Sequence, residues 1–132
     1  MNDLKFHHIG VATKSIEKEL QFFLKLGYQQ ISDVFCDETQ KIKGVFIAAP
    51  FAPTLELLEN LDETGPLSGV LEKGIKFYHF AYETQDIETD LKKLVDNGAI
   101  VVRPIVNATY FEKICFCMLR NMMMIELVQK KN

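Results

Sequence analysis

Apolar and polar positions near the start of the chain predict a strand followed by an amphipathic helix. Apolar and β-branched residues over 4–12 predict the strand. The helix begins after Ser15, a favourable N-cap residue, and ends at Gly27, because a glycine just past a helix adopts positive φ without strain. Its apolar residues follow the spacing i, i+4, i+7 and i+8, which places them on one face: Ile16, Leu20, Phe23 and Leu24.

A shift of 71 positions places this stretch over a second one with the same pattern. Six positions are identical without a gap, and they pair His8 with His79, Thr13 with Thr84, Ile16 with Ile87, Glu17 with Glu88, Leu20 with Leu91, and Gly27 with Gly98. The second helix begins after Asp86, and its apolar residues repeat the spacing of the first: Ile87, Leu91, Leu94 and Val95. An internal repeat of this kind predicts a fold built from two copies of one unit.

Three further strands are predicted after the helix in each half. In the first half they are 28–35, 44–49 and 54–59; in the second, which opens with strand 77–83, they are 99–106, 110–119 and 122–129. The chain is therefore predicted to be one α+β domain over 1–132, with repeat one at about 4–59, a linker at 60–74 and repeat two at about 75–129. Since one helix covers one face of a sheet, a site is expected between the uncovered faces of the two curled sheets.

Composition and charge narrow the classes of function. A net charge of -3 argues against a nucleic-acid partner, which would require a basic patch. No apolar run is long enough to span a membrane, and the N-terminus has no apolar signal region. The three cysteines Cys36, Cys115 and Cys117 are odd in number, which indicates reduced thiols and a cytoplasmic location.

Each half carries a histidine in its first predicted strand and a glutamate in its last. His8 precedes Glu56 by 48 residues, and His79 precedes Glu126 by 47. Both glutamates stand between apolar strand neighbours, where an ionised carboxylate is costly unless a positive partner compensates it. Taken singly, each of these residues has a plainer interpretation as a core or solvent-facing side chain. The match at four repeat-equivalent positions favours one shared divalent metal, and Ni, Co, Zn, Fe and Mn all suit the donors.

The repeat, the strand openings at 8–12 and 78–82, and the strand endings at 55–59 and 125–128 resemble the vicinal oxygen chelate superfamily, in particular its glyoxalase I and methylmalonyl-CoA epimerase branch. The resemblance covers nearly the whole chain. It implies paired βαβββ modules that form a cupped, barrel-like mixed sheet, with helices outside and one divalent metal inside.

The resemblance also implies the chemistry. The metal ligands would be His8, Glu56, His79 and Glu126. The enzyme would be a lyase or isomerase that abstracts a proton next to a carbonyl, by way of an enediolate or enolate chelated to the metal. Glu126 is the better candidate for the base and Glu56 the second.

The sequence departs from both named activities, which leaves the substrate open between a 2-oxo thiol adduct and an acyl thioester. The epimerases usually have glutamine at the position of Glu56 and a carboxylate on the third strand, where 45–47 has none. Against a glutathione-type glyoxalase, no arginine follows shortly after His8, and the residues 119–122 replace the usual turn. Two other functions stay open: a metal-dependent dioxygenase of the same superfamily and a non-catalytic, drug-sequestering binding module. A homodimer is the expected assembly.

Overall fold

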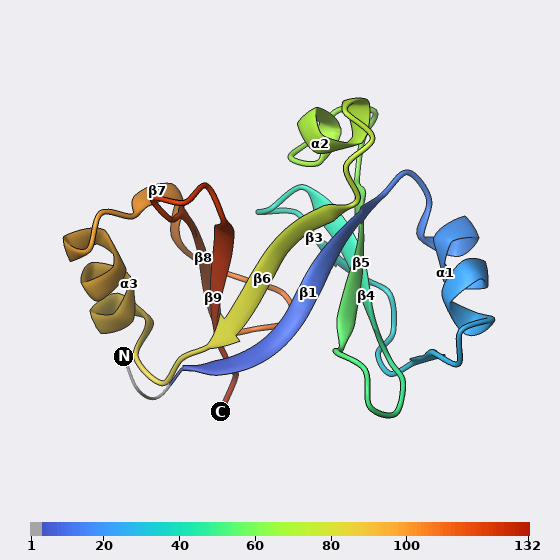
Figure 1. Ribbon diagram of the computed structural model, residues 1–132, viewed down its shortest axis with the longest axis horizontal. Helices are drawn as coiled ribbons and strands as arrows, with labels where there is room; N and C mark the ends of the chain where they lie inside the picture. Colours follow the sequence, from blue (N-terminus) through green and yellow to red (C-terminus); the bar gives the residue numbers. More distant parts are fainter. Residues whose placement is uncertain (1–3) are drawn as a thin grey trace. The chain divides into compact units, whose positions relative to one another are not determined.

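A computed structural model describes residues 4–132. The expected absence of a signal region rests in part on residues 1–3, which lie outside the described residues. The described chain forms nine strands and three helices, which confirms the α+β class. It divides into two compact units. The first unit is His8–Tyr78, and the second combines the described residues up to His7 with His79–Asn132. Figure 1 labels the helices and most of the strands of both.

In the first unit the strands lie in the order β2-β4-β5-β1, and β3 also pairs with β4. β1 and β5 are parallel, whereas β4 is antiparallel to β5. The bounds are β1 (Lys5–Thr13), α1 (Ile16–Leu24), β2 (Gln29–Gln30), β3 (Phe35–Asp37), β4 (Ile42–Ala48), β5 (Leu55–Asn60) and α2 (Ser68–Glu72). The last residues of the unit begin the next strand, β6 (Phe77–Glu83).

The second unit repeats this arrangement with the strand order β6-β9-β8-β7. Its first and last strands, β6 and β9, are parallel, and β8 is antiparallel to both β9 and β7. The bounds are β6 (Phe77–Glu83), α3 (Ile87–Asp96), β7 (Ile100–Asn107), β8 (Lys113–Met118) and β9 (Met124–Gln129). Each half thus has a strand, a helix and then antiparallel strands, of which the last returns parallel to the first.

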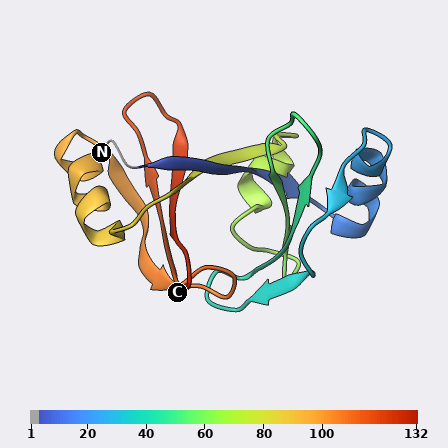
Figure 2. The same ribbon diagram turned by 90° about the horizontal axis from the view of Figure 1, so that it is seen from below.

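Each long helix covers one face of the sheet of its own unit (Figures 1 and 2). Ile16 of α1 is buried against Val11, Val45 and Leu57, with Leu20 and Phe23 packed beside them. In α3, Ile87, Leu91 and Leu94 pack in the same way. The fourth apolar position of each helix packs least, since Leu24 is 44% exposed and Val95 41%. At about 100° per residue, this position lies about 80° around the helix from the first, at the edge of the buried stripe.

The predicted strand over 28–35 is also wrong, since only Gln29–Gln30 and Phe35–Asp37 have strand geometry. The Ile31 N–H still donates to the Phe46 carbonyl at 2.9 Å. The Phe46 N–H, however, donates to the Ser32 side-chain oxygen at 2.9 Å instead of to a backbone carbonyl. A serine hydroxyl that accepts a ladder hydrogen bond offers the backbone an alternative to the sheet, and the strand is interrupted there.

In both units the last strand is tied to the first residue of the helix. The Glu59 carboxylate accepts a hydrogen bond from the Ile16 N–H at 2.8 Å, and the Gln129 side-chain oxygen accepts one from the Ile87 N–H at 3.0 Å. The first N–H groups of a helix have no partner within the helix, so these side chains satisfy one donor each. Glu59 and Gln129 each follow a predicted metal ligand by three residues, which links the ligand-bearing strands to the helices.

Two of the three cysteines lie in the core. Cys115 and Cys117 are buried beneath α3, and Cys36 is exposed. Burial raises the pKa of Cys115 to about 12, and it also raises the pKa of Cys117. None of the helices in the described part of the chain has the length and apolar character needed to cross a bilayer.

Candidate functional site

The first unit brings His8 and Glu56 together. His8 lies on β1 and Glu56 on the parallel strand β5, where the partner of Glu56 is Gly10, two residues beyond the histidine. Residues two apart on a strand share a face, so both side chains lie on the same side of the sheet. The His8 Nε2 and Glu56 Oε1 atoms are 3.0 Å apart. His8 is fully buried and Glu56 is 6% exposed, so the pair lies away from water.

The second unit repeats this pair with the same register. Glu126 on β9 pairs with Ala81 on β6, again two residues beyond the histidine. The His79 Nε2 and Glu126 Oε1 atoms are also 3.0 Å apart, and both residues are buried. The repeat visible in the sequence therefore extends to the placement of the side chains that carry the predicted chemistry.

An aromatic ring from the strand beyond the glutamate-bearing strand packs against each histidine. The rings of His8 and Phe46 meet edge to face with centroids 5.0 Å apart, and those of His79 and Phe116 at 5.1 Å. Phe46 and Phe116 are the strand partners of Glu56 and Glu126. The sequence pattern did not single out Phe46, although its place equivalent to Phe116 in the two repeats could have indicated it. They keep each pair in an apolar environment, where electrostatic interactions are stronger than in water.

These contacts define what each pair can do. Imidazole nitrogens and carboxylate oxygens are common donors to divalent metals, and each buried pair offers one of each. The structure brings His8 to Glu56 within the first unit and His79 to Glu126 within the second. A single site that joins the two pairs remains a prediction.

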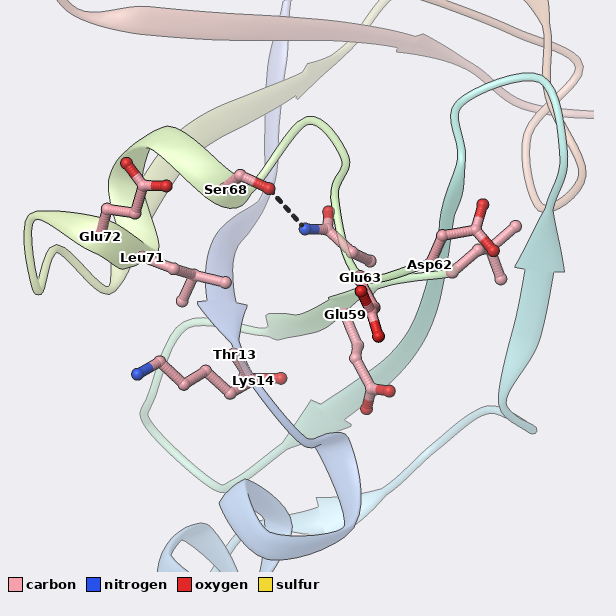
Figure 3. A pocket seen from close by; sticks show the side chains of 10 residues that line it. Thr13, Lys14, Glu59, Asp62, Glu63, Ser68, Leu71 and Glu72 are labelled. Carbon is pink, nitrogen blue, oxygen red and sulfur yellow. Dashed lines mark hydrogen bonds between the residues drawn. The ribbon is translucent and has the colours of Figure 1, made fainter.

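The first unit also contains a cleft that the sequence did not predict. It has a volume of about 560 Å³, and Figure 3 shows the side chains that line it. The lining comes from the ends of β1 and β5, the following loop and α2: Thr13, Lys14, Glu59, Asn60, Leu61, Asp62, Glu63, Ser68, Leu71 and Glu72. Within it the Asn60 amide donates to the Ser68 hydroxyl at 3.2 Å. The predicted ligands His8 and Glu56 do not line this cleft, which is therefore separate from the buried pair.

Comparison with protein families gives a match over most of the chain. The model of the Glyoxalase/Bleomycin resistance protein/Dioxygenase superfamily matches residues 7–117. A search of curated protein sequences found no match.

Solved structures show the same fold at low sequence identity. A hypothetical protein, BH1468, from Bacillus halodurans is 24% identical, with a TM-score of 0.86 over 98% of this chain and 96% of its own. Methylmalonyl-CoA epimerase from Mycobacterium tuberculosis is 20% identical, with a TM-score of 0.83 over 96% of this chain and 88% of its own. A Streptomyces coelicolor methylmalonyl-CoA epimerase variant in complex with 2-nitronate-propionyl-CoA is 20% identical, with a TM-score of 0.81 over 97% of this chain and 98% of its own.

Proposed function

Because the chain belongs to the Glyoxalase/Bleomycin resistance protein/Dioxygenase superfamily, we propose that it is a metal-dependent isomerase or lyase. Its reaction would be the removal of a proton from the carbon next to a substrate carbonyl. The substrate would be a small acyl thioester or a 2-oxo thiol adduct. The observation that carries this proposal is the matched pair of buried His–Glu contacts, each at 3.0 Å and each in the same strand register.

The residues that would hold the metal are His8, Glu56, His79 and Glu126. Two carboxylates at buried positions are costly unless a cation compensates them. Within each pair the Nε2 and Oε1 atoms are 3.0 Å apart, so both donor atoms could be held by one ion. Ni, Co, Zn, Fe and Mn all accept such donors, and the donor set does not select one of them.

The metal, when bound, would supply a Lewis acid that polarises the substrate carbonyl and makes the neighbouring C–H more acidic. The protein's own part is the proton transfer. Glu126 is the proposed base, and Glu56 is the second candidate, because each presents a carboxylate within a buried site. No other carboxylate is available from the paired strand β4 near Glu56, since Val45, Phe46 and Ile47 are apolar and buried.

A proposed ligand set with two members from each unit makes the whole of 1–132 one functional domain. The first test is metal content. The purified protein should carry a stoichiometric divalent metal, and His8→Asn should lose it. The control is His7→Asn, which removes the adjacent histidine on the opposite face of the strand. Equal metal binding by His8→Asn and the parent protein would exclude this ligand set, and a metal-free parent whose stability ignores added Ni, Co or Zn would favour the binding-module alternative.

The second test is proton exchange. A panel of acyl thioesters and 2-oxo thiol adducts should include a compound that gains deuterium from heavy water only when the metal is present. Glu126→Gln preserves the side-chain shape and removes the proton acceptor, so exchange should fall by at least about 100-fold, in the range that general-base catalysis contributes. Full exchange activity in Glu126→Gln would show that Glu126 is not the base and would direct attention to Glu56.

A further inference from the structure

A second, smaller cavity lies beside the cleft in the first unit. Its volume is about 360 Å³, at the small end of the range for ligand pockets. It lies between the first two turns of α1 and the segment after α2, and it is lined by Lys14, Ser15, Lys18, Glu19, Phe22, Leu71, Gly74, Ile75 and Lys76. Because a water molecule in the liquid occupies about 30 Å³, the space suits a ligand of about a dozen non-hydrogen atoms.

The charged groups around this cavity are mainly positive, although the protein as a whole has a net charge of -3. Three lysines stand against one glutamate, and Glu19 is already paired with Lys76 at 2.6 Å. Neither Lys14 nor Lys18 has an ion-pair partner among the residues that the structure describes. Figure 3 shows that the Lys14 side chain extends away from the Glu59 carboxylate. Two exposed ammonium groups are therefore available at the rim.

The rest of the lining is apolar and open to solvent. Phe22 is 67% exposed and Ile75 43% exposed, and Lys14 and Leu71 line both the cavity and the cleft. An exposed aromatic ring next to an aliphatic side chain offers a flat apolar surface, and covering it would remove that surface from water. In the neighbouring cleft the carboxylates of Glu59, Asp62, Glu63 and Glu72 stand against Lys14 alone, so a negatively charged ligand would be favoured in the cavity and disfavoured in the cleft.

We propose that this cavity binds a small amphipathic organic anion, namely an aryl or short alkyl group that carries a carboxylate or phosphate. The apolar part lies against Phe22 and Ile75, and the anionic group lies between Lys14 and Lys18. This site is separate from the buried His–Glu pairs and does not depend on the proposed enzymatic function.

Titration of the whole protein with phenyl phosphate, followed by calorimetry and by amide NMR shifts, tests the proposal. Phenyl phosphate should shift the amides of residues 15–18 and 74–76, and it should bind more tightly than inorganic phosphate or benzyl alcohol. Replacing Lys14 and Lys18 together with glutamine should weaken binding about three- to tenfold, as expected for two exposed charge interactions. Added salt should weaken binding by the parent protein in the same direction.

Matched variants separate the site from general surface effects. Lys25→Gln removes an exposed lysine from the far end of the same helix and should leave the affinity unchanged. Phe22→Ser should weaken phenyl phosphate but not inorganic phosphate. Equal affinities for phenyl phosphate and inorganic phosphate, unchanged affinity in the double lysine variant, or shifts confined to other residues would each overturn the proposal.

Discussion

Replacing Gly98 with alanine should destabilise the protein more than the same replacement at Gly27. The two glycines end α3 and α1 at equivalent places in the repeat, and their φ angles are +98° and +93°. An alanine Cβ at position 27 would have no atom within 4 Å. At position 98 it would lie 3.0 Å from the Arg120 Cγ and nearer still to the Cδ. The backbone strain is thus the same in both variants, and only the contact with Arg120 differs.

The expected magnitudes follow from these two contributions. Positive φ costs an L-residue about 1–2 kcal/mol, so Gly27→Ala should lower the free energy of unfolding by about 1 kcal/mol. In Gly98→Ala the exposed Arg120 side chain must also leave its rotamer, which costs a further amount of about 0.5–1.5 kcal/mol. The difference between the two variants should therefore be about 1 kcal/mol, and Arg120→Ala should remove it, because the obstructing atoms are gone.

Urea unfolding at equilibrium measures these differences. With an m-value of about 2 kcal/mol/M, 1 kcal/mol corresponds to a midpoint shift of about 0.5 M. The complete cycle measures the stability change caused by Gly98→Ala in the parent protein and in the Arg120→Ala variant. The same two backgrounds with Gly27→Ala serve as the control. The reasoning is refuted if both glycine variants shift the midpoint equally, or if Arg120→Ala leaves the excess cost of Gly98→Ala unchanged.

Four further predictions concern stability and reactivity. Glu59→Ala should lower the free energy of unfolding by about 1–2 kcal/mol, because the α1 N-terminus loses its hydrogen-bond acceptor. Glu59→Gln should lower it less, because a glutamine, Gln129, accepts the equivalent hydrogen bond in the second unit. Equal losses of stability in urea unfolding would contradict this. Met122→Gly should raise the free energy of unfolding by about 1 kcal/mol, since Met122 has a φ of +71° and is 76% exposed; an unchanged urea midpoint would contradict it. A thiol reagent should label Cys36 alone in the native protein at pH 8. Because burial raises the pKa of Cys115 in the native state to about 12, the unfolded state loses its thiol proton first, and stability should fall as the pH rises above about 9; a flat profile there would argue against this.

The sequence predicted the repeat and the candidate ligands because both depend on local spacing. His8 and His79 stand at one offset, and each glutamate stands near the end of its half, so the pairing of first and last strands in each unit follows from the order of the elements. The distance between the histidine and glutamate side chains of each pair did not follow from the order of the elements. It depends on parallel strand register, in which a shift of one residue would turn Glu56 or Glu126 to the other face.

Other features depend on contacts that no local pattern records. The interruption of the predicted strand at 28–35 depends on Ser32 accepting a hydrogen bond from Phe46, 14 residues away. Leu24 is exposed because the core contacts of α1 are made by Ile16, Leu20 and Phe23, and apolar periodicity alone does not show which apolar positions make those contacts. The lysine-rimmed cavity is lined by residues of α1 and of the segment after α2. These segments are far apart in the sequence, so the cavity forms only when the chain is folded.

The strand that opens the chain is shared between the two compact units. Leu4 packs in the core of the second unit, and the Phe6 ring meets those of Phe80 and Tyr82 there, whereas the chain from His8 onward belongs to the first unit. A gene split at the linker would therefore not release two self-sufficient halves. The C-terminal fragment would lack its N-terminal segment, and the N-terminal fragment would carry that segment with its apolar side chains uncovered. The internal repeat thus forms a chain in which a short N-terminal segment belongs to the unit of the other half, and each fragment should fold only when the two are mixed.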